Sequence, residues 1–87
     1  MLYVISYDLN KPGQGYSELY KSIKKLGSWC HYLDSTWLVD SSLSAHKIQD
    51  ILNSKIDKND SLLIFRLGKD YGGWMKTSAW SWINKHL

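Results

Sequence analysis

The first residues of the chain alternate in a way that predicts a β-strand. Residues 2–8 are mostly β-branched or aromatic, as strand residues commonly are. Tyr3, Ile5 and Tyr7 fall on one side of this strand, and Asp8 falls on the other, because successive side chains point to opposite faces. The pattern predicts a strand that ends in a carboxylate.

Three segments carry apolar residues at helical spacing. The first follows a Pro/Gly loop, with Ser17 as the expected capping residue and Gly27 as a left-handed stop. The second follows Ser44, a capping residue preceded by a leucine that can staple onto the helix. The third is short and follows Thr77. The expected apolar faces are Tyr16, Leu19, Tyr20, Ile23 and Leu26; Ile48, Ile51 and Leu52; and Trp80, Ile83, Asn84 and Leu87.

Two further segments read as strands. Residues 28–40 predict two short strands that turn around Leu33, Asp34 and Ser35. The run from Ser61 to Leu67 is too short and too apolar for an independent helix, so we expect a central strand buried on both faces.

The resulting order is strand, helix, strand, strand, helix, strand, with a C-terminal helix added. Two right-handed crossovers then place both helices on one face of an antiparallel sheet. The predicted fold is an α+β, ferredoxin-like βαββαβ sandwich with a short C-terminal helical appendage. Residues 1–67 form the ferredoxin-like domain, and residues 68–87 pack on the same domain or on a dimer partner. The other sheet face is left for the tail, a second copy of the chain or a ligand to cover, and a homodimer is the simplest of these solutions.

Composition narrows the class of protein. The chain has 87 residues, enough for one core, and no apolar run long enough to span a membrane. Cys30 is the single cysteine, so an internal disulfide is excluded and a cytoplasmic location is expected. Five Trp and six Tyr accompany one arginine, Arg66, and the net charge is +3. This balance permits an anionic partner but lacks the arginine clusters of proteins that read duplex DNA.

The segments YVISYDL, WCHYLDSTWLV and DKNDSLLIFRL together resemble one family. The chain looks like a SinR-like small protein, a family similar to the small subunit of the CRISPR spacer-acquisition complex and to virulence-associated protein D. The resemblance spans residues 1–67 and implies a symmetric ferredoxin-like dimer. In some members it implies a magnesium-dependent nuclease that uses a first-strand carboxylate, which is Asp8 here. Ser35 matches a hydroxyl residue of the second strand, and Asp60-Ser61-Leu62 resembles the entry into the last strand.

Two residues could support catalysis. Asp8 from both chains of a dimer would give the carboxylate pair that magnesium commonly uses. The favoured reading has Asp8 accept backbone N–H bonds in the next loop or contact a ligand. His31 could act as a general acid or base, although a partly buried, hydrogen-bonded histidine is the favoured reading.

A binding surface is indicated where aromatic residues and lysines share loops, since bases stack on rings while ammonium groups meet phosphates. The candidate ligand-binding residues are Tyr7, Asn10, Lys11, Trp29, Ser35, Lys69, Tyr71 and Trp74. Lysines 21, 24 and 25 are read as a solvated helix face.

The sequence therefore predicts a homodimer that binds RNA, single-stranded DNA or a nucleotide without catalysis. The relatives usually carry arginine and glutamine before the hairpin serine, whereas this chain has residues 31–34, HYLD, there. The acid, Asp34, lies near a site that should bind phosphate, which favours binding over cleavage. The alternatives are a magnesium-dependent endoribonuclease that uses Asp8 of both chains, and a small-ligand or protein-interaction module with no nucleic-acid role.

Overall fold

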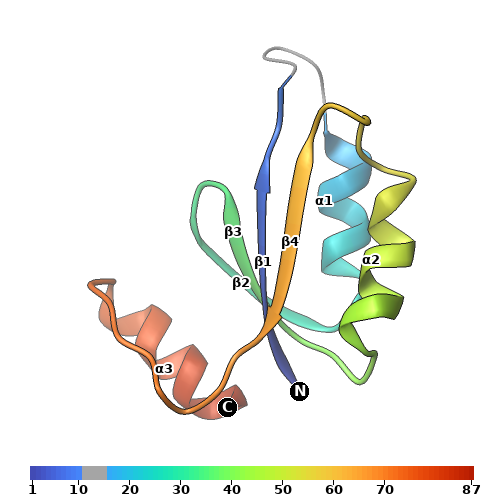
Figure 1. The fold of residues 1–87 in the computed structure, drawn as a ribbon. Coiled ribbons are helices and arrows are strands. Elements are labelled where there is room, and N and C mark those ends of the chain that lie inside the picture. Colours follow the sequence, from blue (N-terminus) through green and yellow to red (C-terminus); the bar gives the residue numbers. More distant parts are fainter. Residues whose placement is uncertain (11–15) are drawn as a thin grey trace.

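The structure is a computed structural model that describes residues 1–10 and 16–87 (Figure 1). The expected order of elements is confirmed. The elements are β1 (Leu2–Asp8), α1 (Ser17–Lys24), β2 (Ser28–Leu33), β3 (Thr36–Asp40), α2 (Ala45–Asn53), β4 (Ser61–Arg66) and α3 (Thr77–His86).

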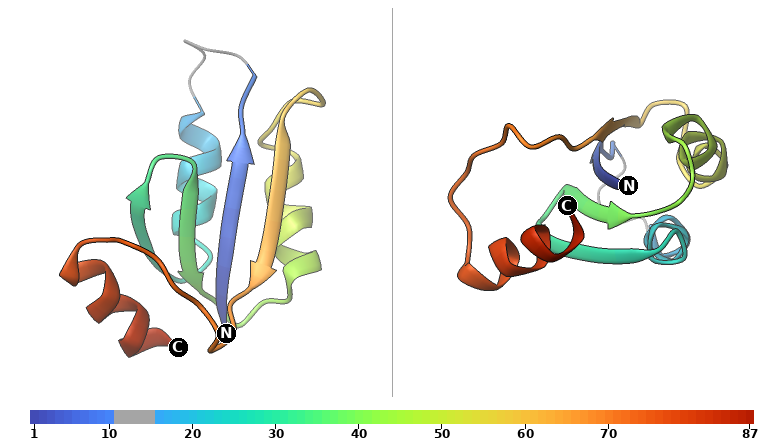
Figure 2. Two further views of the ribbon diagram at one scale, coloured as in Figure 1. Left: turned by 60° about the vertical axis from the view of Figure 1, so that its left-hand side comes forward. Right: turned by 90° about the horizontal axis from the view of Figure 1, so that it is seen from below.

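The four strands form one antiparallel sheet in the order β2-β3-β1-β4. Val4 of β1, for example, lies opposite Leu38 of β3 and Phe65 of β4. Helices α1 and α2 lie together on one face of the sheet, and Figure 2 shows both behind the strands. This arrangement is the ferredoxin-like βαββαβ fold that the sequence predicted, with a C-terminal helix added.

The main core fills the space between the sheet and these two helices. Its buried residues are Tyr3, Ile5, Tyr7, Leu19, Ile23, Trp37, Val39, Ile48 and Leu52. The odd-numbered positions of β1 supply three of them, because alternation turns these side chains toward the helices. Full burial of one such side chain stabilises the fold by about 1.5–3 kcal/mol.

The helix boundaries confirm one cap and correct two others. Ser44 caps α2, since its Oγ accepts a hydrogen bond from the N–H of Lys47 at 3.2 Å. Ser17 and Thr77 are instead the first helical residues of α1 and α3, and the residues before them make no side-chain cap bond. Ile51 was expected in the buried stripe of α2, but it lies 41% exposed.

Gly27 has a different role from the left-handed stop that the sequence indicated. Its backbone does not lie in the left-handed region. A Cβ at this position would overlap the backbone carbonyl oxygen of Asp40, at the end of β3. Glycine is therefore required by a close approach of two backbone segments.

The prediction of a central, doubly buried last strand is wrong, because β4 is an edge strand. Leu63 and Phe65 are 53% and 59% exposed. Both helices cover the other face, so these two side chains remain uncovered on the face turned away from α1 and α2, which we call the open face.

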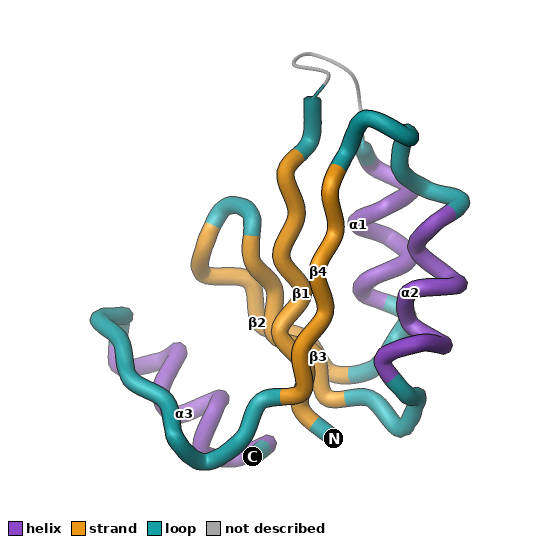
Figure 3. The backbone as a smooth tube through the Cα atoms, in the orientation of Figure 1, coloured by secondary structure: helices purple, strands orange, loops and turns teal. Residues whose placement is uncertain are grey.

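The tail, residues 68–87, covers part of the open face on the β2 side. Figure 3 shows a long loop leading from β4 to α3, and α3 contacts β2. Ala79 and Ile83 are its buried residues. A cavity of about 190 Å³ remains between the tail and the sheet, lined by apolar side chains that include Cys30, Leu38 and Trp80.

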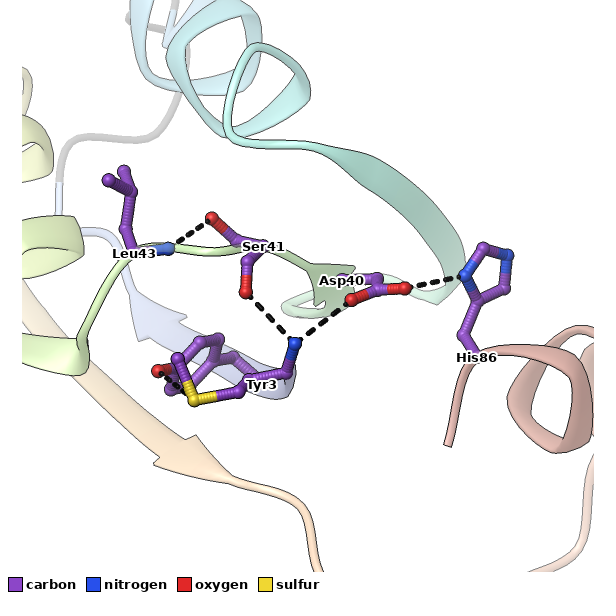
Figure 4. A network of polar contacts seen from close by, with 6 residues as sticks. Tyr3, Asp40, Ser41, Leu43 and His86 are labelled. Atoms are coloured by element: carbon purple, nitrogen blue, oxygen red, sulfur yellow. Dashed lines mark hydrogen bonds and ion pairs between the residues drawn. The ribbon is translucent and has the colours of Figure 1, made fainter.

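A polar network fastens the end of α3 to the sheet (Figure 4). His86 Nδ1 lies 2.9 Å from Asp40 Oδ2, and the ammonium of Met1 donates to Asp40 Oδ1 at 3.1 Å and to the carbonyl of Ser41 at 3.0 Å. The hydrogen bond from His86, followed by the bond from Met1, lowers the pKa of Asp40.

Within residues 1–10 and 16–87, no helix is long and apolar enough to cross a membrane.

Candidate functional site

Asp8 stands where β1 ends, exposed and in register with Ser61 of β4. Alternation puts it on the same face as Val4 and Ser6, which is the open face. A shallow hollow lies beside it, lined among others by Ser6, Ser61 and Leu63. The predicted carboxylate therefore borders the uncovered half of the open face.

A second hollow lies on the other side of Asp8, between the strand end, α1 and the β2–β3 turn. We call it the strand-end hollow; its lining residues are Tyr7, Asp8, Leu9, Tyr20, Asp34 and Ser35. The backbone N–H of Tyr7 donates to the carbonyl of Ser35 at 3.1 Å, which holds the turn against β1. The fold thus brings Asp8 and Ser35 together and adds Asp34, which was not among the candidate site residues.

Tyr7 lies in the core and does not offer a stacking surface, contrary to the prediction. It is 9% exposed, with its ring 6.1 Å from that of Tyr20. Its hydroxyl accepts a hydrogen bond from Trp37 Nε1 at 3.0 Å and donates to the carbonyl of Asp34 at 3.3 Å. Burial raises the pKa of this phenol. The side chain supports the hairpin turn from beneath.

Asn10 joins two loops. Its backbone N–H donates to Asp60 Oδ1 at 2.8 Å, and its side-chain amide donates to the carbonyl of Asn59. Asp60 also accepts from the N–H of Asp57 at 2.8 Å and from the hydroxyl of Tyr16 at 3.2 Å. These contacts tie the end of β1 to the turn before β4. Lys11, another candidate ligand-binding residue, lies outside the described residues.

Trp29 and His31 of β2 project toward the helix side of the sheet, where both rings contact Trp37. Trp29 is 42% exposed, and His31 is exposed as well. His31 Nε2 lies 3.0 Å from the carbonyl oxygen of Asp34, so this nitrogen carries the proton, because a carbonyl only accepts. Strict alternation along β2 would put Leu33 on the same face, but a register shift after Cys30 turns it toward the cavity beneath the tail.

The tail residues form a separate group. The tail leaves β4 at Arg66, which pairs with Tyr3, so it starts at the end of the sheet opposite Asp8. Tyr71 stacks on Trp80 with a centroid distance of 5.9 Å and donates from its hydroxyl to Asn84 Oδ1 at 3.2 Å. Trp74 is 98% exposed, and Lys69 is exposed too. The fold therefore does not bring all the predicted binding residues to one place.

The carboxylates around Asp8 bear on magnesium binding. Among the described residues, no three His, Cys, Asp or Glu side chains converge on a point that could hold a metal ion. Asp8 and Asp34 line the same hollow, and magnesium commonly uses one or two carboxylates with waters and substrate phosphates. These residues fit magnesium when a second chain or a phosphate group supplies further oxygen ligands.

Comparison with known proteins supports the fold. No family model matches the chain, and no curated protein matches it by sequence. Among solved structures, the chain is similar to Cas2 of Streptococcus pyogenes, with 24% sequence identity and a TM-score of 0.58. The match covers 80% of this chain and 89% of that chain. The likeness to the small subunit of the CRISPR spacer-acquisition complex is therefore confirmed at the level of the ferredoxin-like fold.

Proposed function

We propose that this chain is a homodimer that binds single-stranded nucleic acid or a nucleotide without cleaving it. The main support for a dimer is the uncovered half of the open face, where Leu63 and Phe65 expose more than half of their surface. Adjacent exposed apolar side chains are typical of a surface that another protein covers. In a two-fold dimer each chain uses the same patch, so residues near the axis meet their own copies.

Nucleic acid is the favoured ligand because of the composition and the likeness in fold. The net charge of +3 attracts phosphates, and exposed aromatic side chains such as Trp29 offer faces for bases. Asp8 and Asp34 repel phosphates unless a cation lies between them. Binding in the absence of magnesium must therefore use basic residues away from the strand-end hollow.

The second candidate is the magnesium-dependent endoribonuclease that uses Asp8 of both chains. It is favoured by the position of Asp8, which borders the proposed dimer surface and shares the strand-end hollow with Asp34. Bound magnesium would polarise a phosphate and lower the pKa of an attacking water. The chain's own carboxylates would hold and orient the ion.

One experiment distinguishes binding without cleavage from the endoribonuclease. Fluorescently labelled RNA and single-stranded DNA of about 15 nucleotides are incubated with the protein, with magnesium or with chelator, and both binding and strand integrity are measured. We expect binding in chelator, affinity that falls as salt rises, and intact strands. Asp8→Asn should leave this binding unchanged or tighten it, and Asp50→Asn, an exposed acid on α2, is the matched control.

Two results would contradict the proposal. Cleavage that requires magnesium and is lost in Asp8→Asn but kept in Asp50→Asn would establish the endoribonuclease. If RNA, single-stranded DNA and mononucleotides all fail to bind, the nucleic-acid role is wrong and the interaction module without such a role remains.

A further inference from the structure

Two exposed ring-bearing side chains lie side by side on the helix-facing side of β2. Trp29 and His31 are two residues apart on this edge strand, so both point the same way. Together they form a surface that we call the aromatic ledge. Trp29 is 42% exposed, and a tryptophan that serves the core alone would be more deeply covered.

The ledge is held rigid from below by Trp37, which is 2% exposed. The ring of His31 stacks on Trp37 with a centroid distance of 3.7 Å and an angle of 12° between the planes. Trp29 leans against the same indole at 5.3 Å, and Tyr20 of α1 stacks on it at 6.0 Å. The hydrogen bond from Trp37 Nε1 to the Tyr7 hydroxyl fixes the indole further. Rigid rings lose little conformational entropy when a ligand stacks on them.

The charge beside Trp29, at one end of the ledge, is positive. Lys24 of α1 places its Nζ 4.9 Å from the ring centroid of Trp29. Lys25 follows it in the chain, and Lys21 is engaged by Glu18 at 3.7 Å. An exposed cation–π contact is weak, so a planar ligand can displace the ammonium from the ring at little cost. Once displaced, the ammonium is free to meet an anion attached to that ligand.

This pairing of flat rings with a mobile cation fits one kind of ligand. A nucleobase supplies a flat face for stacking, and its phosphate supplies the anion. The base must be unpaired, because the faces of bases inside a duplex are already stacked. The ledge also lies away from the open face, so the proposed dimer surface does not cover it.

We propose that the aromatic ledge stacks an unpaired base of single-stranded nucleic acid while Lys24 meets a neighbouring phosphate. This inference rests on the proposed function and states where on the surface the ligand binds. It also accounts for binding without magnesium, because the phosphate then lies against α1 and not between Asp8 and Asp34.

The test compares two exposed tryptophans in chelator, with labelled RNA and single-stranded DNA of about 15 nucleotides. Trp29→Leu should weaken binding by roughly fivefold to a hundredfold, the cost of losing one stacked base. Trp74→Leu, at a position that is 98% exposed in the tail, should change the dissociation constant by less than about twofold. Trp29→Phe keeps a stacking ring and should retain most of the affinity.

Lys24→Gln tests the phosphate contact separately. It should weaken binding to all sequences alike and reduce the salt dependence by about one released counterion, whereas Lys55→Gln after α2 should not. Circular dichroism of each variant shows whether the fold is kept. If Trp29→Leu does not fold, Trp29→Phe and Lys24→Gln decide the matter.

The possible failures are distinguishable. If the folded Trp29→Leu and Lys24→Gln variants bind as the wild type does, the ledge is not the site, and the proposed function stands. If Trp74→Leu loses as much affinity as Trp29→Leu, the ledge is not the specific site. If the wild type binds no oligonucleotide, the ledge proposal fails, and the proposed function fails with it when mononucleotides do not bind either.

Discussion

At Gly27 a single added carbon atom would disturb the backbone. Gly27 lies between α1 and β2, and a methyl group there would overlap the carbonyl oxygen of Asp40, which cannot move without distorting β3. We expect Gly27→Ala to lower the free energy of unfolding by about 1–3 kcal/mol or more. Urea denaturation followed by tryptophan fluorescence measures this change.

Gly68 provides the matched control for this substitution. A Cβ at Gly68 would meet no atom within 4 Å. Gly68→Ala should therefore change the free energy of unfolding by no more than about 0.5 kcal/mol. Equal effects of the two substitutions would show that the close approach at Gly27 is not what requires glycine there.

Residues whose roles depend on near neighbours in the chain were predictable, and others were not. The cap at Ser44 depends on an N–H three residues away, and it was predicted correctly. Gly27 was singled out for the wrong reason, because its constraint comes from Asp40, which is distant in the sequence. Lys24 read as a solvated lysine, since nothing in its own helix shows that Trp29 lies beneath it.

At the scale of elements, the docking of α3 depends on a few contacts. Ala79 and Ile83 are buried against the sheet, and His86 bonds to Asp40. The pKa of Asp40 is lowered in the folded state, so the folded protein binds this proton less readily than the unfolded chain. This contribution to stability is present above the ordinary pKa of 3.8 and is lost as the pH falls through the lower, folded value.

Asp40→Asn should remove that contribution. At about pH 7 the variant should be less stable than the wild type by up to about 1 kcal/mol, because the pair is partly exposed. At about pH 2.5 the difference should shrink, since the wild-type carboxyl is then increasingly protonated. Urea midpoints at both pH values measure this, with Asp50→Asn as control. A difference that persists unchanged in acid would rule out the charge of Asp40 as the cause.

The order of elements could be predicted because each element has a local signal in the sequence. What covers the apolar face of each element could not be predicted. The apolar run of β4 indicated burial on both faces. The fold places β4 at the edge, with Leu62 and Ile64 packed against the core and Leu63 and Phe65 left on the open face. Sequence periodicity shows that a face is apolar, but not which part of the molecule, or which partner, covers it.

At the scale of the whole molecule, the tail divides the open face. The β2 side is covered by α3 and the loop before it, and the β1–β4 side keeps Leu63 and Phe65 exposed. The strand-end hollow and the aromatic ledge both lie outside the part that the tail covers. A dimer built on the β1–β4 side therefore leaves the tail in place and the ledge accessible.

This division predicts which substitution breaks the dimer. Phe65→Lys puts a charge at the centre of the exposed apolar half, and burying that charge without a partner is costly. We expect the wild type to sediment as a dimer and Phe65→Lys as a folded monomer. Ile51→Lys, on the exposed side of α2 and 41% exposed before substitution, should leave the dimer intact. Analytical ultracentrifugation over a range of concentrations distinguishes these species. If Ile51→Lys dissociates the dimer and Phe65→Lys does not, the chains associate through the helices, and Asp8 of one chain is not brought near its copy.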